Sequence, residues 1–124
     1  MNIKLFKMIF NRALRIKSRD SKVGEKMFIY LRERLATMLG SGDTYYDSSL
    51  CFELVRISTQ HDKTEDALNY LEEGRKILEE HYGGQNSPNY IDYYLRKVEL
   101  YVNLVLDANN AMKDKKKDPE DRMT

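Results

Sequence analysis

The sequence lacks most of the features that mark a catalytic or metal-binding chain. Its single cysteine, Cys51, excludes an internal disulfide framework and a metal site built from several cysteines. The two histidines, His61 and His81, have no second histidine or cysteine three or four positions away. No glycine-rich loop of the phosphate-binding kind is present. We therefore expect no enzyme, no bound metal and no cofactor.

Long apolar runs are also missing. None approaches the roughly 20 residues that a helix needs to span a bilayer. Residues 1–19 are rich in Lys and Arg and contain no acid, a composition shared by mitochondrial targeting peptides and by helices that lie on membrane surfaces. An ordinary amphipathic helix of the fold is the interpretation we favour. We expect a cytoplasmic protein, with mitochondrial association as the alternative.

Charge is divided unevenly along the chain. Residues 1–40 carry ten Lys and Arg against three acids, whereas residues 41–112 carry six against thirteen. Opposite charges can attract each other within the fold, or can favour head-to-tail association of copies into a homo-oligomer. Only the first segment offers the basic surface that nucleic acid requires, so we place nucleic acid well behind protein as a partner.

Few glycines and prolines interrupt the chain, and the spacing of apolar residues predicts five helices. They cover about 2–17, about 22–39, a segment that opens with a capping box at 44–47, about 62–82, and about 88–112. In the last helix we expect one core stripe, made of Ile91, Leu95, Val98, Val102 and Val105. The predicted fold is all-α, with a single helical domain over 1–112 and a charged, solvated tail over 113–124.

The chain also matches itself at a fixed offset. A shift of 40 places Glu25, Tyr30, Leu31 and Glu33 on Glu65, Tyr70, Leu71 and Glu73. A shift of 41 places Leu50, Leu54 and Ile57 on Ile91, Leu95 and Val98. Periods of this size are typical of stacked helical hairpins, because each hairpin buries its apolar face only against its neighbours.

One part of this pattern resembles a known family. Residues 67–78, followed by His81-Tyr82-Gly83 and Asn86-Ser87-Pro88, are similar to the second helix of a tetratricopeptide repeat. The closest style is the long version seen in kinesin light chains and in the C-terminal lobe of SMYD methyltransferases. In that pattern two small residues, here Ala67 and Gly74, let helices pack closely. The resemblance implies an array of antiparallel helical hairpins with about two and a half repeats.

Tyrosine is abundant, with nine residues against no tryptophan, and four of them crowd the fifth helix. Tyr93, Lys97, Leu100 and Leu104 form a second face there, opposite the expected core stripe. Either both faces are buried, or one of them lines a groove. In tetratricopeptide repeats the first helix of each hairpin lines the concave surface. The resemblance therefore implies partner-binding residues at Phe52, Arg56, Gln60, Tyr93 and Lys97.

These observations favour a non-catalytic protein–protein interaction module. It would act as an adaptor that binds a peptide or a partner helix in a groove, and two cations beside aromatic rings would suit an acidic or C-terminal peptide. One alternative is a structural subunit of a homo- or hetero-oligomer. Another is a membrane-associated adaptor that uses residues 1–19 without spanning the membrane.

Overall fold

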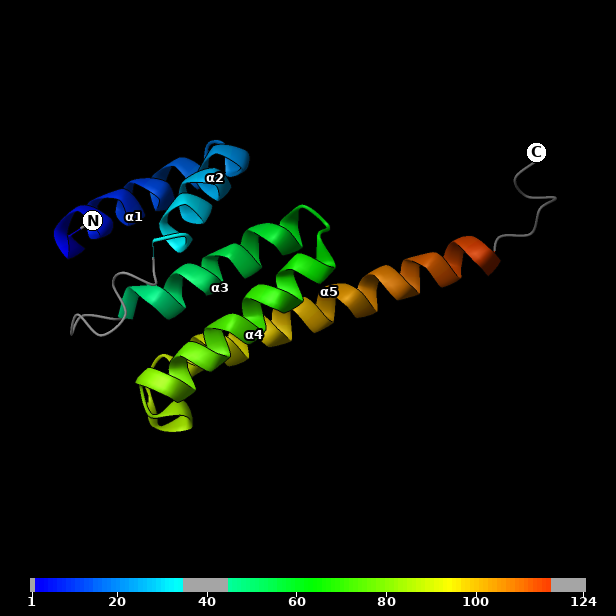
Figure 1. Cartoon of the computed structure of the whole chain (residues 1–124). Helices are drawn as coiled ribbons and strands as arrows, with labels where there is room; N and C mark the ends of the chain where they lie inside the picture. Colours follow the sequence, from blue (N-terminus) through cyan, green and yellow to red (C-terminus); the bar gives the residue numbers. More distant parts are fainter. Residues whose placement is uncertain (1, 35–44, 117–124) are drawn as a thin grey trace.

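The computed structural model describes residues 2–34 and 45–116, and these two segments hold five α-helices and no strand. The helices are α1 (Ile3–Lys17), α2 (Ser21–Arg32), α3 (Tyr45–Gln60), α4 (Thr64–His81) and α5 (Tyr90–Lys116), with a 3-10 helix, η2 (Gly84–Asn86), before α5. Helices α1 and α2 form one hairpin, α3 and α4 form a second, and α5 follows (Figure 1). The expected all-α fold of five helices is confirmed.

Several helix boundaries follow from residues that satisfy free backbone groups. The side chain of Asn2 accepts a hydrogen bond from the Leu5 amide, and Asp20 accepts from the amides of Lys22 and Val23. Gly83 has a φ of 78°, a left-handed conformation that glycine adopts without steric cost, and it ends α4 as expected. Helix α5 begins two residues after Pro88, close to the predicted start.

Three boundaries differ from the prediction. Helix α2 ends at Arg32 rather than near residue 39, and both residues 35–39 and Thr44 of the expected capping box lie outside the described residues. Helix α4 begins at Thr64 rather than near residue 62: Asp62 has a φ of 57°, and Lys63 precedes the helix without a side-chain capping hydrogen bond. Asp62 lies in the turn that follows α3, in a left-handed conformation that aspartate adopts more readily than most residues. Helix α5 continues to Lys116, so the tail expected over 113–124 begins as helix.

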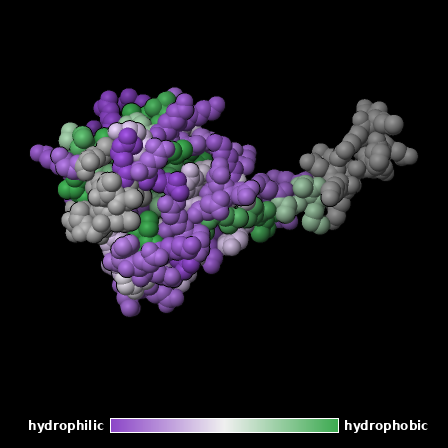
Figure 2. Space-filling model, in the orientation of Figure 1, coloured by the Kyte–Doolittle hydropathy of each residue, from purple (hydrophilic) through white to green (hydrophobic). Residues whose placement is uncertain are grey.

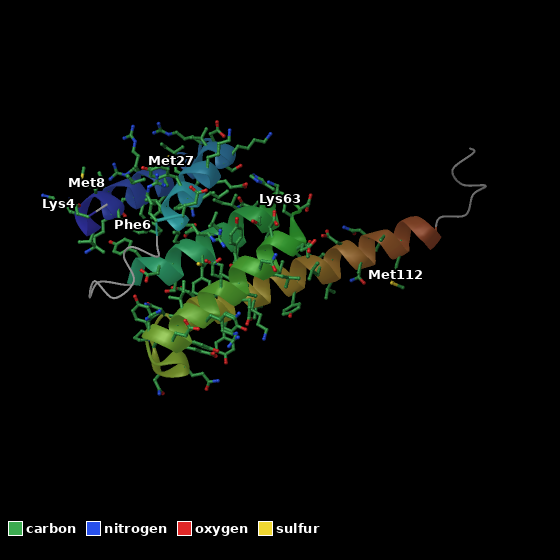
Figure 3. The ribbon with its side chains drawn as sticks, viewed as in Figure 1. Lys4, Phe6, Met8, Met27, Lys63 and Met112 are labelled. Carbon is green, nitrogen blue, oxygen red and sulfur yellow. The ribbon has the colours of Figure 1, made fainter. Side chains whose placement is uncertain are left out.

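The first hairpin shares one core with α3. Buried side chains from all three helices form it: Phe6, Phe10, Ala13, Phe28, Leu31, Leu50, Leu54 and Ile57. The rings of Phe10 and Phe28 meet edge to face, with centroids 5.6 Å apart. Gly24 allows α1 and α2 to cross closely, since a Cβ there would lie 2.6 Å from the Cβ of Lys17. The basic N-terminal segment therefore forms a helix that contributes Phe6, labelled in Figure 3, to the core.

Ion pairs join the basic hairpin to the acidic remainder. Lys17 of α1 pairs with Glu53 of α3. Arg32 of α2 lies 2.8 Å from a Glu73 oxygen of α4, and this hydrogen bond raises the pKa of the guanidinium. At these two points, the opposite charges of the two parts of the chain therefore attract each other within the fold.

A second core joins α3 to α4 and α5. It contains Phe52, Val55, Ala67, Leu71, Leu78, Tyr90, Tyr93 and Leu100. Gly74 lies at its tightest point, since a Cβ there would stand 2.5 Å from Cε1 of Phe52. The small residues expected at 67 and 74 are therefore both buried between helices. Helix α3 contributes to both cores and forms the centre of the molecule.

Candidate protein-binding surface

Helix α5 is apolar on two faces, and only one of them is covered. Tyr90, Tyr93 and Leu100 are buried in the second core, and Leu104 packs against its edge. A second set of nine apolar side chains each keep between 48% and 64% of their surface exposed: Ile91, Tyr94, Leu95, Val98, Tyr101, Val102, Val105, Leu106 and Met112. We call this set the outer face of α5. Contiguous apolar surface of this extent is uncommon on a monomer and marks interaction sites.

This arrangement reverses the prediction for α5. The expected core stripe, with Ile91, Leu95 and Val98 among its members, is exposed, whereas Tyr93 and Leu100 of the opposite face are buried. The physical reason is position in the array. Helix α3 has neighbours on both sides, but within residues 2–34 and 45–116 no helix follows α5 to cover its outer face.

The outer face forms a shallow apolar depression. Its volume is about 500 Å³, and it is lined by Tyr94, Lys97, Val98, Tyr101, Val102, Val105 and Leu106. Figure 2 shows hydrophobic atoms gathered where α5 leaves the body of the molecule. Lys97 is the one charged residue of this lining, and its ammonium lies 5.7 Å from the ring centroid of Tyr93. The depression is therefore suited to binding apolar side chains, and Lys97 gives it a basic edge.

A more polar groove runs beside it, between α3 and α5. Its volume is about 360 Å³. The lining residues are Arg56, Thr59 and Gln60 from α3 and Val98, Glu99, Val102 and Asn103 from α5. Val98 and Val102 belong to both linings, so the groove and the apolar depression are continuous. Arg56 and Lys97 consequently stand on opposite sides of this valine pair.

A third depression lies among α1, α3 and α5. It holds about 310 Å³, and its lining includes Asn11, Ser49, Glu53, Asp92 and Arg96. The Ser49 hydroxyl and Nε of Arg96 are buried there without a hydrogen-bond partner. Polar atoms in a depression large enough for water are ordinarily satisfied by water. Two carboxylates beside one guanidinium define no particular ligand, so we treat this depression as a hydrated part of the fold.

The structure separates the five residues that the sequence proposed for partner binding. Arg56 and Gln60 are exposed and line the α3–α5 groove, and Lys97 lines the apolar depression. Phe52 and Tyr93 are only 3% and 8% exposed, and their ring centroids lie 6.4 Å apart in the second core. They support the surface from beneath and leave little area for a partner. Val98 and Val102, together with Tyr94 and Tyr101, form the exposed walls instead.

The residues missed by the sequence reasoning shared a detectable pattern. Ile91, Val98, Val105 and Met112 recur every seven residues, and Tyr94, Tyr101 and Ala108 follow three positions after the first three of them. This is the spacing of a helix that pairs with another helix through a narrow seam. The apolar stripe was recognised, but it was interpreted as contact within the chain.

One hydrogen-bond network has the residue types of a catalytic triad. His61 Nε2 lies 2.7 Å from the Ser21 hydroxyl, and His61 Nδ1 lies 2.9 Å from a Glu25 oxygen. The amides at the start of α2, which would be needed to stabilise an oxyanion, donate to Asp20. Glu25 also accepts from Lys63, the turn residue labelled in Figure 3. We interpret the network as the link between α2 and the α3–α4 turn.

No protein-family model, curated protein or solved structure matches the chain. Among the residues that the structure describes, no helix is both long enough and apolar enough to cross a membrane. The same residues contain no group of three or more His, Cys, Asp or Glu side chains placed to hold a metal ion. The outer face of α5 and the groove beside it therefore form the candidate site.

Proposed function

We propose that this chain is a non-catalytic protein–protein interaction module that binds a helix of its partner along the outer face of α5. The observation that carries the proposal is the exposure of nine large apolar side chains on one helix. Leaving such area in water is unfavourable, and covering it releases free energy in proportion to the area removed from solvent. Surface of this kind is accordingly expected to be occupied in the working state of the protein.

The chemistry of the surface defines the kind of partner. Its centre is apolar, with Val98 and Val102 beside the aromatic side chains of Tyr94 and Tyr101, so the partner should present an apolar helix face. Arg56 and Lys97 flank this centre, so acidic residues beside the partner's apolar stripe would meet opposite charge. The stacked hairpins and the packing at Gly74 also support our proposal that the array is a divergent, tetratricopeptide-like one.

The test is capture of partners from a native extract with matched variants. Val98→Glu together with Val102→Glu places two charges in the centre of the surface, and binding should be lost because those charges would be buried without partners. Gln85→Glu together with Asn69→Glu adds the same charge at exposed positions outside α5, and binding should persist. Equal capture by all three proteins, each verified as folded by circular dichroism, would contradict the proposal.

A structural subunit of an oligomer is the second candidate, and the projecting end of α5 favours it. From Val105 onward, the described side chains of α5 are all exposed, and Met112 lies well clear of the body (Figure 3). The part of a helix that projects in this way contributes nothing to the core of its own chain. Its natural role is to bind another molecule.

A further inference from the structure

The outer face of α5 runs without interruption from the body of the molecule onto its projecting end. Helix α5 has 27 residues and is therefore about 40 Å long. Its first half packs on α3 and α4 through Tyr93 and Leu100, and its second half extends away from them (Figures 1 and 2). An isolated helix of about a dozen residues is marginal in water. The projecting half therefore needs packing that its own chain does not supply among the described residues.

The face has the spacing of a two-helix seam. Four positions recur at intervals of seven, Ile91, Val98, Val105 and Met112, and three of the four are β-branched. The positions three residues later are Tyr94, Tyr101 and Ala108, and all seven side chains are exposed. A sustained seven-residue apolar repeat keeps one narrow stripe facing a partner helix along its whole length. The seam spans both halves of α5, so one straight helix could cover all of it.

We propose that this helix is α5 of a second copy of the chain, packed antiparallel about a two-fold axis. The inference rests on the proposed function and names its partner. In each copy the exposed seam runs over both halves of α5: the half that packs on the body and the half that projects from it. An antiparallel pair lays each projecting half over the body-held half of the other copy, so a single self-complementary contact covers both.

Charge favours the antiparallel direction over the parallel one. Residues 113–116, at the end of α5, carry three lysines and one aspartate. Near the start of α5, Glu79 and Glu80 at the end of α4 are exposed, and Asp92 in the first turn of α5 is half-buried. Antiparallel pairing brings the basic end of one copy to the acidic end of the other, whereas parallel pairing would place like charges together. The helix dipoles are also opposed only in the antiparallel pair.

The available area is sufficient for a stable dimer. A standard interface buries on the order of 800 Å² on each partner. Nine large apolar side chains, each about half exposed, supply an area of that order from α5 alone. The valine pair at the centre and the tyrosines around it would form the fully buried part, where most binding energy is concentrated.

The first experiment measures the mass of the purified protein by sedimentation equilibrium over a wide concentration range. We expect a dimer that dissociates on dilution. Val98→Glu with Val105→Glu should raise its dissociation constant at least about 100-fold, because both charges would be buried in the seam. The control, Gln85→Glu with Asn69→Glu, places both charges outside α5 and should dimerise as the parent chain does. A monomer at every concentration, or a dimer unaffected by the seam variant, overturns the inference.

The second experiment tests the direction of the helices with a short bismaleimide cross-linker. Positions 91 and 112 are 21 residues apart, which is about 31 Å along one helix. Mixed Ile91→Cys and Met112→Cys proteins should cross-link to each other, whereas each alone should not. The parent chain is the control for Cys51, which is buried. Cross-linking of each variant only to itself overturns the antiparallel pairing.

Failure of the dimer and failure of the proposed function can be told apart. If the purified chain is monomeric but Val98→Glu with Val102→Glu still abolishes capture of another protein, the outer face binds a different helix and only the second copy is rejected. If the seam variants change neither self-association nor capture, both proposals fail.

Discussion

Helices α3 and α5 have similar patterns of apolar residues, but they lie in different surroundings. Both are apolar on two faces. In α3 one face, with Leu54, packs on the first hairpin, and the other, with Val55, packs on α4 and α5, and both side chains are almost fully buried. In α5 Leu100 is 2% exposed and Leu95 is 51% exposed. An apolar pattern therefore specifies which faces need a partner but not whether the chain provides one.

The difference follows from the order of helices in a stacked array. An inner helix has a neighbour on each side, whereas a terminal helix has only one, unless a further element or another molecule covers it. Terminal helices that remain alone are normally polar on their outer side. Helix α5 is apolar there over the whole length of its seam, so its sequence is that of an inner helix.

The largest expected effect tests this comparison directly. Leu54 and Leu95 are equivalent under the 41-residue offset, and they are 0% and 51% exposed. Leu54→Ala should lower the free energy of unfolding by about 2–5 kcal/mol, because it leaves a cavity in the first core. Leu95→Ala should cost less than about 0.5 kcal/mol in dilute protein. Urea denaturation gives both values, and an equal loss at low concentration would mean that α5 is covered within the monomer.

A smaller effect is expected where α3 and α4 approach most closely. Gly74→Ala places a methyl group against the ring of Phe52, which is held in the core beside Tyr93. The overpacking should cost about 1–3 kcal/mol, partly offset by the better helix propensity of alanine.

The reason for that loss can be separated from helix propensity by a second substitution. Phe52→Leu removes the ring edge that the new methyl would strike, so Gly74→Ala should be better tolerated in that background. Urea denaturation of the two single variants and the double variant gives the coupling energy. Simple additivity would contradict the role of Gly74 as a contact between α3 and α4.

The buried thiol of Cys51 on α3 should make the stability of the fold depend on pH in alkaline solution. Burial raises the pKa of Cys51 on α3, so the unfolded thiol, with a pKa of about 8.5, ionises at lower pH than the folded one. Stability should be independent of this group below that pH. Above it, stability should fall by up to about 1.4 kcal/mol per pH unit, because only the unfolded state gains from ionisation.

The measurement compares urea unfolding at about pH 7.5 and pH 9.5. Cys51→Ala should lose this part of the alkaline destabilisation. In that background Val98→Cys, which places a thiol on the exposed side of α5, should not restore it. A parent chain and a Cys51→Ala variant with the same pH dependence would contradict a buried thiol.

The sequence predicted those features that depend on local chemistry. Helix spacing and the stop at Gly83 follow from apolar periodicity and backbone preference, and the structure agrees with both. The close packing at Ala67 and Gly74 was implied by the resemblance to tetratricopeptide repeats, and both residues are buried. The close crossing at Gly24 was missed, because a single glycine within a helix does not by itself identify its neighbour. For α5 the spacing of the apolar stripe was predicted correctly, but the stripe was expected to be buried and is exposed.

The proposed site was predicted only in part, for a related reason. The resemblance to tetratricopeptide repeats implies that Phe52 and Tyr93 lie on the concave surface together with Arg56 and Lys97. Periodicity gives the face of a helix, but it does not give the depth of a side chain below the surface. The aromatic pair fills the core, while the cations reach the exposed groove and depression above it. Depth depends on contacts from other helices, which are distant in sequence.

A small effect on the fold is expected from the cations beside the outer face. Arg56→Glu with Lys97→Glu reverses two charges that flank the valine pair and leaves both cores unchanged. Stability should change by no more than about 1 kcal/mol, mostly through loss of the contact between Lys97 and the Tyr93 ring. Circular dichroism should show the same helical fold as the parent chain.

The same double charge reversal should affect binding through the outer face differently from the free energy of unfolding. Charges at the rim of an interface act mainly on the rate of association and on its dependence on salt, whereas buried apolar contacts determine the rate of dissociation. The double reversal should therefore slow association with an acidic partner and change the salt dependence, while dissociation stays close to that of the parent chain. Surface plasmon resonance at two salt concentrations separates these rates. A large increase in the dissociation rate would instead show that Arg56 and Lys97 lie within the buried part of the interface, and the apolar seam would then no longer be its centre.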